Sequence, residues 1–185
     1  MTDRNLLPEI ILDVRKALGA EAYLAALSLV LTIPDICGKA EYGDKMCPKK
    51  RYITWYNEWI GQYEKPPEDD ETAYLSGEVV YQLRCSLFHQ GTPNIEKEKI
   101  KEESCKIDYF QIVIEPKNSE DIYIDGSAAY LDNRNKSKII CYDVNLRRLC
   151  NCIIGAAEAY ARKNKDKFSF FQYSIKEYGF GEIWE

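Results

Sequence analysis

The chain has 185 residues, of which 45% are hydrophobic and 30% are charged, and its formal net charge is −5. These values are typical of one soluble globular domain. They argue against a disordered chain and against a protein that coats itself non-specifically with nucleic acid. No apolar run approaches the roughly 18 residues of a membrane-spanning helix, and acidic residues interrupt the apolar N-terminus, which argues against a signal peptide. We therefore expect a cytoplasmic protein that is not attached to a membrane.

The cysteine and histidine content argues against a metal site and against a disulfide framework. The chain has seven cysteines, none in a CxxC pair, and one histidine. Cys150 and Cys152 lie two residues apart, which separates their side chains by about 200° on a helix. No plausible set of three or four metal ligands remains. We expect free thiols in a reducing compartment, no structural or catalytic metal, and no cofactor.

The first third of the chain has a helical pattern of apolar residues. A first helix is expected from Leu6 to about Leu18, and a second over residues 20–32, before Pro34. The residues from there to Pro48 contain several turn formers and predict an irregular connection. A third helix is expected over residues 48–63. Its aromatic residues recur at three- and four-residue spacing and are interpreted as core, although a base-stacking face is the alternative: Tyr52, Trp55, Tyr56, Trp59 and Tyr63.

A fourth helix is expected in the middle of the chain. An acidic, proline-containing linker over residues 64–71 precedes it, and acidic residues favour a helix N-terminus. The helix is expected to run from about Thr72 to His89 and to end at Gly91, a candidate left-handed cap. The charge-dense residues 94–103 that follow suggest a short exposed helix.

The periodicity then changes to that of β-strands. Residues 106–116, 121–124 and 138–144 are rich in β-branched and aromatic residues and are separated by turn-like segments, which predicts a small antiparallel sheet. The helical period returns over residues 145–163, with Asp143 or Asn145 as the candidate N-cap, and the aromatic C-terminal residues are expected to pack back on the domain. The expected fold is mainly α (α+β): a single domain with a helical core at about 1–91 and 145–165 and a β insertion at about 106–144.

Basic residues are concentrated between Arg134 and Lys167, where nine lysines and arginines face three acids. A basic strip on an acidic protein can hold a phosphate backbone. The candidate RNA contacts are Arg134, Lys136, Lys138, Arg147 and Arg148. The alternative is a set of ordinary solvated charges.

The only histidine, His89, lies five residues after Arg84. Histidine can take and give protons near neutral pH, and arginine binds phosphate oxygens with a planar, permanently charged fork. Together they suffice for metal-free RNA cleavage, in which His89 takes the proton of a ribose 2′-hydroxyl and Arg84 stabilises the charge that builds on the phosphorus centre. The products would be a 2′,3′-cyclic phosphate and a free 5′-hydroxyl.

Helix geometry limits how these two residues act together. Five helical residues rise about 7.5 Å and turn about 140° beyond a full circle, so the two side chains do not share a face. Either the helix loosens before Gly91, or a second copy of the helix completes the site. The second possibility predicts a homodimer with this helix at or beside its interface.

The residues "LRCSLFHQG", Leu83 to Gly91, resemble the signature of the HEPN superfamily, in which an arginine precedes a histidine by four to six residues near a helix end. The resemblance implies a helical bundle. It also implies a metal-independent endoribonuclease of the kind found in toxin–antitoxin, abortive-infection and CRISPR-associated antiphage systems, which is typically dimeric. By position, Arg84 and His89 match the catalytic pair, whereas Cys85 stands where the family often has asparagine. An antitoxin or a nucleotidyltransferase partner would be a separate chain.

Two other interpretations remain open. The chain can be a catalytically inactive HEPN-like module that binds RNA, a nucleotide or a partner protein. Alternatively, the motif is structural: Arg84 pairs with Glu78 or Asp108, and His89 caps carbonyl groups in the last helical turn. If the motif is catalytic, replacing either residue by alanine should leave stability nearly unchanged, and if it is structural, stability should fall.

Overall fold

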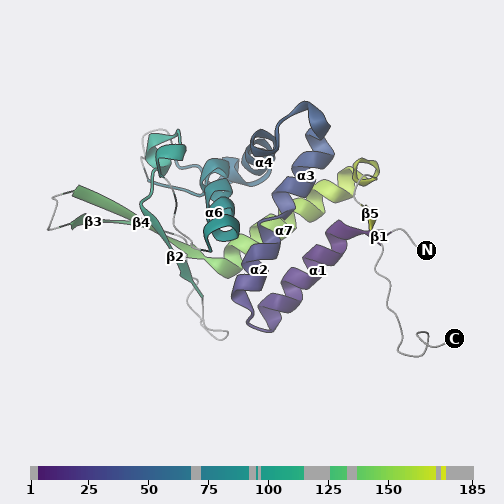
Figure 1. Cartoon of the computed structure of the whole chain (residues 1–185), viewed down its shortest axis with the longest axis horizontal. Coiled ribbons are helices and arrows are strands. Elements are labelled where there is room, and N and C mark those ends of the chain that lie inside the picture. Colours follow the sequence, from purple (N-terminus) through teal and green to yellow (C-terminus); the bar gives the residue numbers. More distant parts are fainter. Residues whose placement is uncertain are drawn as a thin grey trace.

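The computed structural model describes residues 4–67, 72–91, 95, 97–114, 126–132, 137–169 and 172–173, with some of these, including the whole of residues 126–132, described by their backbone alone. This part of the chain is mainly helical. Figure 1 shows the helices gathered into one body, with a small sheet extending from one end and a short strand pair at the other. A single core cluster of apolar residues joins the helices to the sheet.

The N-terminal region forms three helices rather than two. α1 (Leu6–Gly19) confirms the first expected helix, and α2 (Tyr23–Val30) is a shorter version of the second. The predicted irregular connection is wrong over most of its length, because α3 (Ile33–Tyr42) and a 3₁₀ turn, η1 (Gly43–Lys45), occupy it. Pro34 lies in the first turn of α3, where a missing N–H costs nothing, so it begins a helix here.

The stretch Tyr23–Lys45 is long and apolar enough, by length and composition alone, to cross a membrane. It was not predicted as such from the sequence, because Asp35 and Lys39 interrupt its apolar residues. Half of its most apolar window is buried inside the fold. The core helices of soluble proteins meet the same criterion.

The third expected helix is confirmed, with an irregularity in its middle. α4 (Pro48–Tyr56) continues through a π-helical turn, η2 (Asn57–Gly61), into α5 (Gln62–Glu64). Three of its aromatic side chains belong to the core, Trp59 packs partly against it, and Tyr63 is 79% exposed. The core interpretation is therefore correct for the first four aromatic residues and wrong for Tyr63.

The fourth expected helix begins five residues later than predicted. α6 (Gly77–Gln90) is capped by Ser76, whose hydroxyl accepts a hydrogen bond from the backbone N–H of Val79 at 3.4 Å. Gly91 ends the helix in the left-handed conformation, with φ 65°, as expected. Half of the acidic linker, residues 68–71, lies outside the described residues.

The sheet is mixed rather than wholly antiparallel. Its strands β2 (Tyr109–Val113), β3 (Gly126–Asp132) and β4 (Ser137–Asn145) are ordered β2-β4-β3. β3 and β4 pair antiparallel, whereas β2 and β4 pair parallel. The prediction of antiparallel pairing is wrong for β2. This strand does not pair with β3, the next strand in the chain, but lies beside β4 and runs parallel to it. β3 was not expected as a strand, and the expected strand over residues 121–124 lies outside the described residues.

Two 3₁₀ turns, η3 (Lys97–Lys99) and η4 (Glu103–Cys105), replace the expected exposed helix before the sheet. The apolar residues in this region are not exposed, since Ile95 and Ile100 are buried. This segment therefore covers part of the core rather than extending into solvent.

The C-terminal region confirms the last expected helix. α7 (Leu146–Lys163) is capped by Asn145, whose side-chain oxygen accepts a hydrogen bond from the backbone N–H of Arg148 at 3.1 Å. A 3₁₀ turn, η5 (Lys165–Phe168), buries Phe168, and β5 (Gln172–Tyr173) pairs with β1 (Arg4–Asn5). The residues beyond β5 lie outside the described part.

The start of α6 depends on a close backbone approach to α4 and η2. The N–H of Gly77 donates to the Asn57 side-chain oxygen at 2.7 Å. A Cβ at Gly77 would lie 2.6 Å from the Ile53 carbonyl oxygen and 2.9 Å from the Asn57 oxygen. Only glycine fits here, because a backbone carbonyl cannot move aside cheaply.

We predict that Gly77→Ala lowers the free energy of unfolding by about 1–3 kcal/mol through overpacking. Gly155→Ala is the matched control, because nothing lies within 4 Å of a Cβ at this exposed position in α7. It should stabilise the protein by up to about 1 kcal/mol through helix propensity. Urea denaturation measures both, and equal effects of the two substitutions would contradict the close approach.

Candidate functional site

The motif residues Arg84 and His89 both lie on α6, which is a regular α-helix through its last turn. The N–H of Gly91 donates to the carbonyl of Leu87 at 3.2 Å, so the helix does not loosen before its cap. A loosened helix end, which was one of the two ways of bringing the motif residues together, is therefore absent. The two side chains point in directions about 140° apart, as expected for an unbroken helix.

Arg84 forms an ion pair with an acidic residue on another helix. Its Nη2 atom lies 2.6 Å from Oδ2 of Asp35, in the first turn of α3, and the side chains of the two residues are 26% and 23% exposed. The partners proposed from the sequence are wrong. Glu78 instead accepts a hydrogen bond from the backbone N–H of Lys101, and Asp108 binds Lys97 and the N–H of Ile140.

Three aromatic rings enclose the guanidinium group of Arg84. Its central carbon lies 6.0 Å from the ring centre of Tyr52, 5.9 Å from that of Tyr81 and 5.7 Å from that of Phe88. Each ring attracts the cation through its negatively polarised face. The Nε atom of Arg84 is buried and has no hydrogen-bond partner among the described residues. Arg84 is thus held in one orientation rather than extending freely into solvent.

The electrostatics of Asp35 reflect two opposing effects. Burial raises the pKa of the Asp35 carboxyl group above its ordinary value, and the positive charges of Arg84 and Arg51 offset this only in part. Arg84 and Arg51 therefore favour the charged form of Asp35 against the effect of burial.

Asp35 is the functional candidate that the sequence analysis missed. It lies in the segment that was predicted to be an irregular connection. A signal was available, because Asp35 and Lys39 are the only charged residues between Glu21 and Glu41. A lone carboxylate in an apolar helix requires a cation nearby, but nothing in the sequence indicates which of the arginines supplies it.

His89 has a different environment from Arg84. Its side chain is exposed in the last turn of α6, and the neighbouring Phe88 is 47% exposed. The left-handed cap is formed by the backbone N–H of Gly91, and the described residues show no hydrogen bond from the imidazole that would make it a capping group. The end of α6 thus presents an imidazole beside a large apolar ring.

Arg147 and Arg148, the two candidate RNA contacts whose side chains the structure describes, are bound within the chain. Arg147 donates to the hydroxyl of Tyr23 at 3.3 Å and lies over its ring, 5.5 Å from the centre. Arg148 binds both carboxylate oxygens of Glu64, at 2.5 and 2.7 Å. Both arginines therefore stabilise the fold, which leaves less of their charge for RNA.

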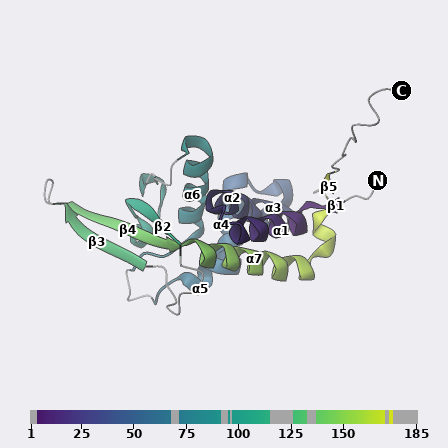
Figure 2. The ribbon, with the colours of Figure 1, turned by 90° about the horizontal axis from the view of Figure 1, so that it is seen from below.

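The remaining candidates of the strip cannot be placed at the site. Arg134 and Lys136 lie outside the described residues, and Lys138 is described only by its backbone in β4. In Figure 2, α7 runs along one edge of the helical body, whereas α6 extends toward the opposite edge. The structure does not bring Arg147 and Arg148 together with the motif residues of the same chain.

Comparisons with known proteins give no further guidance. No protein-family model matches the chain, and neither the curated proteins nor the solved structures include a significant match. Within the described residues, no group of three or more histidine, cysteine or acidic side chains is arranged to hold a metal ion. The interpretation of the site therefore depends on its own geometry.

The ion pair changes the expected effect of removing Arg84. We predict that Arg84→Ala lowers the free energy of unfolding by about 1–3 kcal/mol, because it leaves Asp35 without its compensating charge in a partly buried place. The pKa of Asp35 then rises further, so the variant loses stability, relative to the wild type, as the pH rises through this pKa.

Denaturation of both proteins between pH 4 and 8 measures this loss. In the double variant Asp35→Asn, Arg84→Ala, the unpaired carboxylate is absent. Its free energy of unfolding should therefore differ from that of the wild type by an amount that changes little with pH. A constant difference between Arg84→Ala and the wild type across this range would contradict the role of Asp35.

Proposed function

We propose that this protein is a metal-independent endoribonuclease of the HEPN type, which cleaves RNA at a site completed by a second copy of the chain. The observation that supports this best is the exposed His89 at the end of a regular helix that carries a firmly oriented Arg84 on a different face. The imidazole is accessible to a substrate, as a general base must be.

The proposed reaction needs only the two motif residues. His89 takes the proton of a ribose 2′-hydroxyl, and the 2′-oxygen forms a bond to the neighbouring phosphorus. The bond between phosphorus and the 5′-oxygen breaks, and the leaving oxygen takes a proton from solvent. Arg84 stabilises the additional negative charge on the phosphoryl oxygens in the transition state. A 2′,3′-cyclic phosphate and a 5′-hydroxyl result.

Asp35 would serve as a positioning residue in this mechanism. It binds one Nη atom of Arg84, and the rings of Tyr52, Tyr81 and Phe88 restrict the plane of the guanidinium. Catalytic groups act best when their neighbours hold them in one orientation. Asp35 thus supplies the orienting contact that Cys85 does not provide within the motif.

The need for a second copy follows from the direction of the side chains. On an unbroken helix, Arg84 and His89 diverge by about 140°, so one chain does not readily aim both at one phosphate. A second α6 beside the first would place the histidine of one chain near the arginine of the other. The partly exposed ring of Phe88 adds apolar surface that such a contact would bury.

The ion pair also favours a second candidate function. A carboxylate 2.6 Å from the Arg84 guanidinium competes with a phosphate for the same hydrogen-bond donors. A chain in which Asp35 keeps this position in the presence of RNA would be an inactive module that binds RNA, a nucleotide or a partner protein. The two functions differ in whether purified protein cleaves RNA.

The first experiment is incubation of the purified protein with mixed RNA in EDTA, followed by analysis of the new ends. We predict cleavage that leaves cyclic phosphate and 5′-hydroxyl ends. His89→Ala should abolish it while changing stability by less than about 0.5 kcal/mol, since the side chain is exposed. Undiminished cleavage by His89→Ala would refute the mechanism, and absence of cleavage by the wild type would favour the binding module.

Mixing two inactive variants tests whether the site is shared between chains. We predict that Arg84→Ala and His89→Ala chains, unfolded and refolded together in equal amounts, regain about a quarter of the wild-type activity. Half of the dimers are then mixed, and each mixed dimer has one of its two sites intact. The variants refolded separately are the control, and no recovery on mixing would contradict a shared site.

A further inference from the structure

A groove between α1 and α7 lies apart from the motif on α6 and plays no part in the proposed cleavage. We refer to it as the α1–α7 groove. Its volume is about 720 Å³, within the usual range for small-molecule sites. Its lining comes from α1, the second half of α7 and η5.

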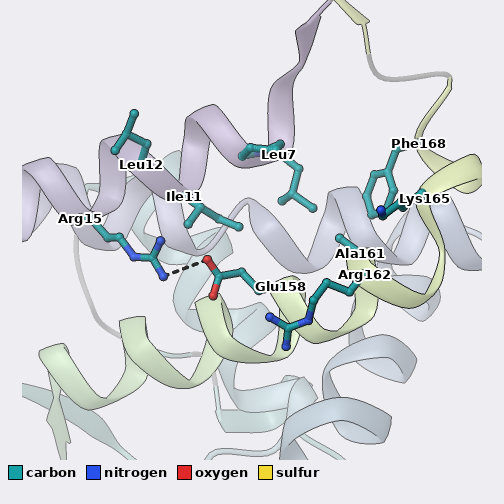
Figure 3. A pocket seen from close by; sticks show the side chains of 10 residues that line it. Leu7, Ile11, Leu12, Arg15, Glu158, Ala161, Arg162, Lys165 and Phe168 are labelled. Carbon is teal, nitrogen blue, oxygen red and sulfur yellow. Dashed lines mark ion pairs between the residues drawn. The ribbon is translucent and has the colours of Figure 1, made fainter.

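The floor of the groove is apolar. Leu7, Ile11 and Phe168 are buried and belong to the core, while Leu12 on the rim is 50% exposed. Figure 3 shows Leu7 and Ile11 extending from α1 toward α7, with Phe168 at the end formed by η5. An apolar chain or ring in the groove would cover this floor and the exposed side of Leu12, which favours binding.

The rim carries more positive than negative charge. At one end, Nη2 of Arg15 lies 2.8 Å from Oε1 of Glu158, so these two charges neutralise one another (Figure 3). Arg162 and Lys165 are exposed and have no ion-pair partner among the described residues. Arg162 complements the C-terminal dipole of α7, but Lys165 lies beyond that helix, so its charge is available to an anion.

We propose that the α1–α7 groove binds a small amphipathic anion, a molecule with one acidic head group and an apolar body of the size of a medium-chain fatty acid. Its head group would contact Lys165 and Arg162, and its body would lie along Leu7, Ile11 and Leu12. The charge of the rim selects an anion, and the apolar floor selects a ligand with a hydrocarbon body. The volume of the groove is in the range of small-molecule sites.

The test uses the full chain and 1-anilinonaphthalene-8-sulfonate, a fluorescent probe with an apolar body and one negative charge. We expect the native protein to bind the probe, sodium decanoate to displace it, and decanol, which has the same tail without the charge, to displace it far less well. Near-ultraviolet circular dichroism under the same conditions confirms that the protein remains folded while the probe is bound.

Substitutions in the groove, each with a control substitution outside it, test whether the ligand binds in the groove. Reversing both rim charges, Arg162→Glu with Lys165→Glu, should weaken decanoate binding about tenfold or more, whereas Lys45→Glu with Lys50→Glu, two exposed lysines outside the groove, should not. Leu12→Asn should weaken binding of the probe, and Leu24→Asn, at an exposed leucine on α2, is its control.

Four results would overturn the proposal. Equal displacement by decanoate and decanol, or equal effects of the groove variants and their controls, would show only non-specific apolar binding. Loss of probe binding as the protein concentration rises would show that the groove is covered by a second copy. A large gain in probe binding on removal of the residues after Tyr173 would show that the chain's own C-terminal segment is the occupant. The result of the RNA cleavage assay affects none of these outcomes.

Discussion

The ion pair between Asp35 on α3 and Arg84 on α6 is the interaction on which the candidate site depends. It joins two helices that are far apart in the sequence, and it does so beside Tyr52 of α4. Burial disfavours the Asp35 carboxylate and raises its pKa, and the positive charges of Arg84 and Arg51 offset that cost only in part. A single arginine therefore contributes both to the fold and to the proposed chemistry.

This dual role explains why the surroundings of the two motif residues, Arg84 and His89, differ so much. Arg84 is enclosed by an acid and three aromatic rings, whereas His89, five residues later on the same helix, is exposed. A group that stabilises transition-state charge benefits from a fixed orientation, and a general base needs access to its substrate. The surroundings of each residue suit the role proposed for it.

The distribution of positive charge has a comparable explanation. The described arginines at the start of α7 bind Tyr23 and Glu64, and thereby attach α7 to α2 and α5. Arg162 and Lys165, which have no ion-pair partner among the described residues, instead lie at and just beyond the other end of α7, at the α1–α7 groove. A count of charges along the chain cannot separate these groups, because what distinguishes them is the presence of acids and hydroxyls from distant segments.

The sequence by itself determined the helical character of the chain, both ends of α1 and α7, the C-terminal end of α6, and the two motif residues. These features are local: Gly91 and Asn145 act on the helix that each adjoins. Only the tertiary structure decided that Pro34 begins a helix, that β4 separates β2 from β3, and that Asp35 is the partner of Arg84. The physical reason is that these outcomes depend on which segments lie side by side, and the pairing of distant residues leaves no periodic pattern in the sequence.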